Sequence, residues 1–185
     1  MANPPGSLAL DQELQALKRR IDELSQRKTV LPTCRVRLAG NAGLPAGADT
    51  FAQGGWVPIE DTFGLFTASA GAPAYITIAH AGFYHVHYHS AAIGAAPAAG
   101  QNPPVATAKV TLNGTSVATN TIATGADVYK AAGADGAVVD AVRDRIPLAV
   151  GDRIYWANWT SVAATLASSV FTVPTEISIR FLATH

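Results

Sequence analysis

The chain has 185 residues, of which 49% are hydrophobic and 14% are charged, and its formal net charge at pH 7 is zero. That length and hydrophobic share predict one domain with an appended segment. A neutral chain with few charges has no basic field to hold nucleic acid, and a single cysteine, Cys34, excludes an intrachain disulfide. No apolar run approaches the roughly 18 residues of a membrane span, so no membrane insertion is expected.

Residues 1–6 end in Pro4-Pro5-Gly6 and predict a flexible tail. Nothing in this tail or after it has the apolar segment of a signal peptide, so we expect a protein made in a cytoplasm.

Residues 7–30 predict a helix whose apolar side chains form a narrow heptad seam rather than the broad stripe of a globular helix. Glu13 and Lys18 fall at a g position and the following e position, which attract each other between parallel helices. A helix this short is marginal alone, so we expect it to form as a trimerisation coiled coil. The alternative is a single helix packed on its own domain. The seam consists of Leu10, Leu14, Leu17, Ile21 and Leu24.

Residues 31–185 predict an all-β domain with no helical period. Alternating apolar residues indicate strands at 34–38, 75–78, 84–89, 105–119 with a turn at Asn113-Gly114, 138–148, 153–159 and 176–182. Pro58 places the short piece 56–59 at a sheet edge. The expected loops are 40–48, 91–104, 121–136 and 161–169.

Two turns in this domain have specific predictions. Gly82 interrupts the alternation between residues 75–78 and 84–89, which predicts a hairpin-like corner at the centre of the sheet. Asn113-Gly114 lies between two alternating runs and predicts a type I′ hairpin turn. Antiparallel strands with long loops predict a sandwich or jelly roll.

The order of several short motifs resembles the C1q and tumour-necrosis-factor-like jelly roll over roughly Cys34 to Leu182. In this sequence, histidine stands where that family usually has an aromatic residue after Tyr84. The motifs are Gly82-Phe83-Tyr84-His85-Val86, Leu112-Asn113-Gly114, Ile146-Pro147-Leu148 followed by Val150-Gly151-Asp152-Arg153-Ile154, and the strand Ile177 to Leu182.

The resemblance implies a compact homotrimer nucleated by the N-terminal coiled coil. Such a head on a short coil, in an alanine-rich chain, is similar to trimeric fibre, tail and capsid-decoration proteins of tailed bacteriophages. We therefore expect a non-enzymatic virion protein that binds other virion proteins through its N-terminal region and a glycan or protein of the host surface through its loops. One alternative is a soluble C1q-like recognition or signalling ligand. The other is a cupin-like metalloenzyme, which is disfavoured because no carboxylate stands beside His85, His87 and His89 in the sequence.

Tyr84, Val86 and Tyr88 are expected to face the core. His85, His87 and His89 alternate with them and therefore share the other face of the strand, with His80 nearby. Neutral imidazole is a ligand for zinc, iron or nickel, so these three residues are the candidate metal ligands, and no other cofactor is expected. The alternative is that they line a subunit interface or a polar surface, because no Asp, Glu or Cys of the same run completes a site.

Trp156 and Trp159 lie three residues apart on a strand and so point to opposite faces, which leaves at least one of them as a candidate subunit or receptor contact. No nucleophile, phosphate-loop or metalloprotease motif is present, and no enzyme is expected. Asp140, Asp144 and Asp152 are expected to form surface ion pairs with the neighbouring Arg143, Arg145 and Arg153.

Overall fold

The structure is a computed structural model of the chain. It describes residues 12–20, 31–94, 104–128, 136–170 and 173–184. The chain divides into two units, Met1–Val30 and Leu31–His185, which are described separately. None of the described helices is long and apolar enough to cross a membrane.

Residues 12–20 of the first unit are helical, as the heptad spacing predicts. Two of the predicted seam residues belong to this helix, and both are exposed, Leu14 at 54% and Leu17 at 63%. The other three, Leu10, Ile21 and Leu24, lie outside the described residues, as does the predicted tail 1–6. Association of this helix into a coiled coil stays a prediction.

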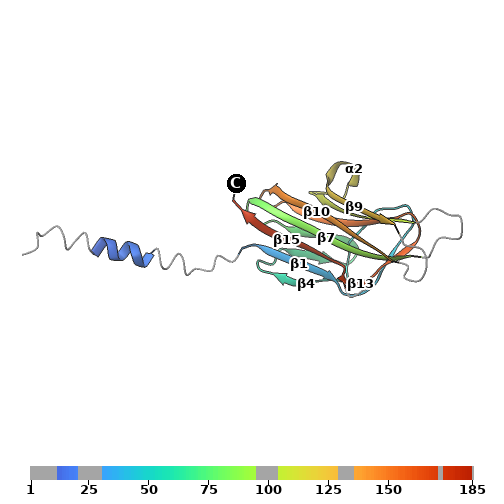
Figure 1. Ribbon diagram of the computed structural model, residues 1–185, viewed down its shortest axis with the longest axis horizontal. Helices are drawn as coiled ribbons and strands as arrows, with labels where there is room; N and C mark the ends of the chain where they lie inside the picture. The colour runs from blue at the N-terminus through green and yellow to red at the C-terminus, as the bar shows by residue number, and fades with distance from the viewer. Residues whose placement is uncertain (1–11, 21–30, 95–103, 129–135, 171–172, 185) are drawn as a thin grey trace, which may run out of the picture. The chain divides into compact units, whose positions relative to one another are not determined.

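The second unit is built mainly from two antiparallel sheets, which confirms the predicted all-β jelly roll (Figure 1). The first sheet has the order β2-β12-β7-β15-β1-β4, and β10 also pairs with β7. Its strands are β1 (Thr33–Leu38), β2 (Ala42–Leu44), β4 (Trp56–Asp61), β7 (Gly82–Gly94), β10 (Gly136–Leu148), β12 (Ala164–Leu166) and β15 (Glu176–Ala183).

The second sheet has the order β5-β6-β11-β8-β9, with β3 paired to β11. Its strands are β3 (Thr50–Phe51), β5 (Phe66–Ser69), β6 (Ala72–Thr77), β8 (Val105–Leu112), β9 (Thr121–Val128) and β11 (Arg153–Thr160). A small separate ribbon pairs β13 (Ser169–Val170) with β14 (Val173–Pro174), and a short helix, α2 (Val117–Asn120), precedes β9.

The core lies between the two sheets and is built by strict alternation along β7. Tyr84, Val86 and Tyr88 are fully buried, so the prediction that they form the core face is confirmed. Opposite them, Trp156 of β11 packs edge-on against Trp56 of β4 at 5.1 Å between ring centroids. Aromatic and branched side chains gain the most from burial, and this fixes which face of β7 turns inward.

A buried polar network joins the sheets within this core. The Nδ2 group of Asn158 on β11 donates to the hydroxyl of Tyr88, and the hydroxyl of Ser90 donates to Oδ1 of Asn158. Burial raises the pKa of Tyr88 strongly, although its hydrogen bonds to Asn158 and Ser90 oppose that rise. Because buried polar groups are costly unless paired, the network stabilises one alignment of β7 against β11.

The structure corrects both turn predictions. β6 and β7 do not pair at Gly82 but belong to different sheets, so the chain crosses the sandwich there instead of forming a hairpin. β8 and β9 do form a hairpin, but residues 113–120 connect them, and α2 replaces the strand expected after Asn113-Gly114. Asn113 has a φ of 57°, whereas Gly114 does not have the positive φ that a type I′ turn requires.

Three predicted loops contain strands. β9 occupies the first half of the expected loop 121–136, and β2 and β12 lie within the expected loops 40–48 and 161–169. β7 also continues four residues beyond Ser90 into the expected loop 91–104. These segments are rich in Ala, Gly and Thr, and each has only one or two large apolar residues, so they lack the alternation by which strands are recognised. The edge position predicted for the segment around Pro58 is confirmed, because β4 ends the path of the first sheet.

Candidate functional site

The outward face of the first sheet carries a ladder of polar side chains whose order follows from strand register. His87 of β7 is level with Val142 of β10 on one side and with Ser178 of β15 on the other, followed by Arg35 of β1 and Glu60 of β4. The next row toward the carboxyl end of β7 contains Asp140, His89, Glu176, Arg37 and Val57.

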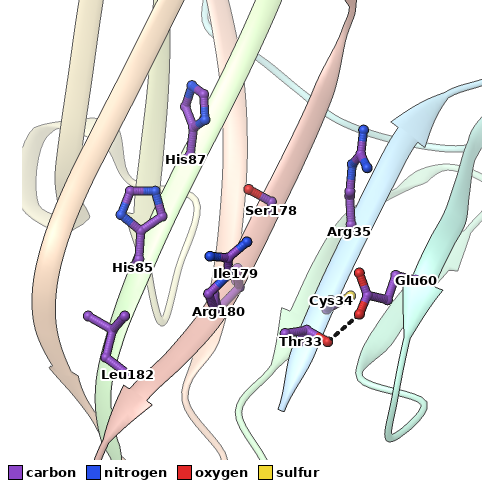
Figure 2. A pocket seen from close by; sticks show the side chains of 10 residues that line it. All are labelled: Thr33, Cys34, Arg35, Glu60, His85, His87, Ser178, Ile179, Arg180 and Leu182. Atoms are coloured by element: carbon purple, nitrogen blue, oxygen red, sulfur yellow. Dashed lines mark hydrogen bonds between the residues drawn. The ribbon is translucent and has the colours of Figure 1, made fainter. Parts of the chain in front are cut away.

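A pocket of about 350 Å³ lies over this face, and His85, His87, Ser178, Arg180, Arg35 and Glu60 are among its lining residues (Figure 2). Arg35 binds Glu176 through Nε and Nη2 at 2.9 to 3.1 Å, and this ion pair raises the pKa of the Arg35 guanidinium. The Thr33 hydroxyl donates to Glu60 at 2.7 Å. These acidic groups are therefore engaged by their own neighbours.

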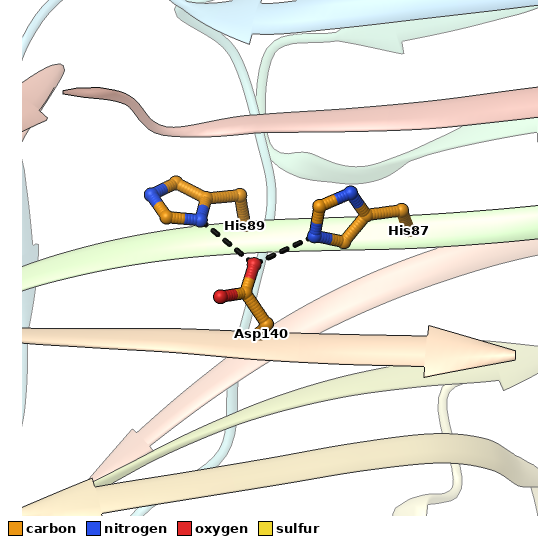
Figure 3. Close-up of side chains that lie close together, drawn as sticks. All are labelled: His87, His89 and Asp140. Carbon is orange, nitrogen blue, oxygen red and sulfur yellow. Dashed lines mark hydrogen bonds and ion pairs between the residues drawn. The ribbon is translucent and has the colours of Figure 1, made fainter.

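Among the described residues, His87, His89 and Asp140 form a cluster of groups that could bind a metal ion (Figure 3). Oδ1 of Asp140 lies 2.6 Å from Nε2 of His87 and 2.8 Å from Nδ1 of His89. Asp140 lies directly opposite His89 in the β7–β10 register and diagonal to His87, which is the spacing at which cross-strand side chains meet. The register of two long strands therefore builds the cluster.

The carboxyl group of Asp140 is affected by two opposing influences. Partial burial raises its pKa, but the hydrogen bonds from His87 and His89 and the charge of these rings lower it, and the pKa ends below its usual value. Asp140 is thus held as a carboxylate that accepts from two rings at once.

His85 makes a separate pair with Asp144, through Nδ1 and Oδ1. Asp144 reaches it because the β7–β10 register shifts between Arg143 and Ile146, where Arg145 adopts a φ of 51°. His80 stands apart from the cluster: its ring packs edge-on against Phe63, and its carbonyl oxygen accepts from the hydroxyl of Tyr84.

The two aspartates were not expected here. Sequence neighbours suggested that Asp140 and Asp144 pair with Arg143 and Arg145, but among the described residues their ion pairs are with histidines. The prediction that no carboxylate completes the histidine face is wrong, because Asp140 reaches it from a different strand, β10, and not from the run 74–90. The alternation of β10, which turns Ala137, Val139 and Ala141 into the core, is the signal that places Asp140 on the outer face.

The two tryptophans are placed on opposite faces, as their spacing requires. Trp156 is completely buried in the core, so it offers no surface to a receptor or another subunit. Trp159 is half-buried on the outward side of β11 and remains the candidate contact. It belongs to the second sheet, whereas the histidine face belongs to the first.

No family model matches the chain, and no curated protein is found similar in sequence. Solved structures do match. The structure of Eiger TNF from S. frugiperda aligns with a TM-score of 0.57 at 12% identity, over 84% of this chain and 94% of that one. Murine APRIL, solved at pH 5.0, aligns with a TM-score of 0.56 at 12% identity, over 82% of this chain and 99% of that one. The structure of murine APRIL at pH 8.0 aligns with a TM-score of 0.55.

This likeness defines the class of fold: residues of the second unit form a TNF-like jelly roll. It agrees with the C1q/TNF-like resemblance drawn from the motif order. At 12% identity the likeness extends to the fold alone, since one fold serves many functions.

Proposed function

We propose that the protein is a non-enzymatic, homotrimeric structural protein of a tailed bacteriophage virion, with a TNF-like head and an N-terminal coiled coil. The observation that carries self-assembly is the pair Leu14 and Leu17. They lie on one side of the helix 12–20 and are 54% and 63% exposed. Leucines at heptad spacing are covered best by the same seam of another copy, and a helix this short needs such a partner.

The virion assignment rests on the combination of features. A short heptad segment precedes a TNF-like head, and the chain is neutral and rich in alanine. This combination is similar to trimeric fibre, minor tail and capsid-decoration proteins. In that role the N-terminal region binds other virion proteins, and the head contacts a host glycan or protein, with Trp159 as the candidate contact. The protein would be made in the host cytoplasm.

The oligomeric state is tested with the full chain by sedimentation equilibrium and mass photometry. The expected mass is that of three chains of 19.1 kDa, about 57 kDa. A monomer at micromolar concentration contradicts the proposal. A dimer would be consistent with the coiled coil but would contradict the trimeric head.

The location is tested by labelling intact phage particles with antibodies against the head and counting copies by quantitative mass spectrometry. We expect the protein on particles, in a copy number divisible by three. Its recovery only in the particle-free fraction would favour the alternative of a soluble C1q-like recognition or signalling ligand.

A further inference from the structure

We propose that His87, His89 and Asp140 bind a divalent transition-metal ion of the zinc class, which links β7 to β10. Two imidazole nitrogens and one carboxylate oxygen are a ligand set that zinc accepts, with a fourth position left for water. The three ligand atoms lie within 4.8 Å of one another. This proposal does not depend on trimer formation, since all three ligands belong to one chain.

The geometry requires only a small expansion. Around a tetrahedral zinc ion with bonds of about 2.1 Å, neighbouring ligand atoms are about 3.4 Å apart. Here Oδ1 of Asp140 lies 2.6 and 2.8 Å from the two ring nitrogens. Rotation of the half-exposed Asp140 side chain can widen both separations, and rotation of the half-exposed His87 side chain can bring the two ring nitrogens, which lie within 4.8 Å of each other, to the same spacing.

The rings present the correct nitrogens to the ion. Nε2 of His87 and Nδ1 of His89 already face the carboxylate, and when zinc binds, each ring carries its proton on its other nitrogen. For His89 that other nitrogen, Nε2, is buried and has no hydrogen-bond partner among the described residues. It lacks a partner whether or not it carries the proton, so the change of tautomer adds little cost.

Burial and charge also favour a cation at this place. The His89 side chain is only 12% exposed, which fixes its ring, whereas His87 and Asp140 leave the site open to solvent. With neutral rings the cluster carries one negative charge. Glu176, level with His89 on β15, holds Arg35 in a bidentate ion pair, so the Arg35 guanidinium is neutralised and does not compete with the ion for Asp140.

The experiment uses full-length protein without a histidine tag, titrated with ZnCl₂ by isothermal calorimetry, and the melting temperature is measured with and without zinc. We expect one Zn²⁺ per chain and a higher melting temperature in its presence. Asp140→Asn and His87→Ala should each weaken zinc binding at least about tenfold, since loss of even an outer partner of a metal site costs that much.

His85→Ala is the matched control, because it removes a histidine from the same strand face that belongs to a different pair. It should bind zinc as the unmodified chain does. Circular dichroism of each variant verifies that the sheets are intact. The proposal is overturned if zinc fails to bind stoichiometrically, or if His85→Ala weakens binding as much as His87→Ala, which would indicate adventitious binding by surface histidines.

Discussion

Cys34 faces the core from β1 and is 1% exposed. Burial, together with the nearby charges of Asp61 and Glu60, raises the pKa of its thiol from 9.0 to about 12. The thiolate is the reactive form of cysteine, so Cys34 in the folded head is inert as well as covered.

We predict that Cys34 makes the folded head sensitive to alkaline pH. The unfolded thiol ionises above about pH 9, whereas the folded one stays protonated until about 12. The stability that the neutral thiol contributes is therefore fully present below pH 9. It is lost as the pH rises toward 12, by at most about 1.4 kcal/mol per pH unit.

Urea unfolding of the unmodified chain and of Cys34→Ala between pH 8 and 10.5 measures this effect. The variant should be less stable at pH 8 but lose less stability as the pH rises. The buried tyrosines affect both proteins alike, so the difference between them isolates the thiol. Equal slopes, or rapid labelling of Cys34 by a thiol reagent without denaturant, would contradict the prediction.

The residues of the candidate site show what a single run of sequence can and cannot reveal. Alternation alone placed His85, His87 and His89 on one face, because a strand has a period of two. Asp140 is 51 residues from His89 in sequence and meets it only through the register of β7 with β10. Register depends on the whole sheet, so the partner could not be read from the histidine run.

At the scale of elements, β9 approaches β10 unusually closely. A Cβ atom added at Gly125 of β9 would overlap the carbonyl group of Asp140 and press against Val139. The absence of a side chain there lets the edge strands of the two sheets come together. It also makes the segment resemble a loop in sequence, because glycine stands at a position where a strand usually carries a side chain.

We predict that Gly125→Ala destabilises the head by about 1–3 kcal/mol, as overpacking of a filled interior does. The atoms nearest to the added Cβ belong to the backbone of β10, which cannot move away as the end of a flexible side chain can. Chemical denaturation monitored by tryptophan fluorescence measures the change.

Gly43→Ala is the control for this prediction. Gly43 also lies in a strand, β2, but an added Cβ has nothing within 4 Å. Its substitution should change stability by less than about 1 kcal/mol, with a gain as its expected sign. If the two variants behave alike, the close contact of β9 with β10 is not as tight as described.

At the scale of the molecule, we predict that the head folds without the coiled coil. Leu17→Asp combined with Ile21→Asp places charges in the predicted seam, where burial of an unpaired charge costs several kcal/mol. The trimer should dissociate or loosen while the sheets persist, because the head has its own core. Sedimentation and circular dichroism measure the two effects.

Arg19→Asp provides the comparison, since Arg19 lies at the outer f position of the predicted heptad and is exposed. It should leave the mass unchanged. Loss of the β signal in the double variant would mean that the two units fold as one.

The fold class was predictable because the strands with large residues, β1, β7, β8, β11 and β15, alternate clearly. The distribution of these strands between the two sheets was not predictable from the sequence. The chain crosses from one sheet to the other at Gly82, where the local pattern suggests a hairpin. Local patterns specify which face of a strand is buried; they do not specify which strand lies beside it.

The pairing of β1 with β15 makes the head almost a closed ring of polypeptide. Thr33 lies opposite Arg180, and the amide of Phe181 donates to the carbonyl oxygen of Pro32 at 3.0 Å. Chain entry and chain exit are thus neighbouring strands, about 4.8 Å apart in a sheet. A short linker could join them, and new ends could open at the exposed turn around Gly151 without removing any β1–β15 hydrogen bond. By the same geometry, a peptide fused after Ala183 would emerge beside the point where the chain enters the head.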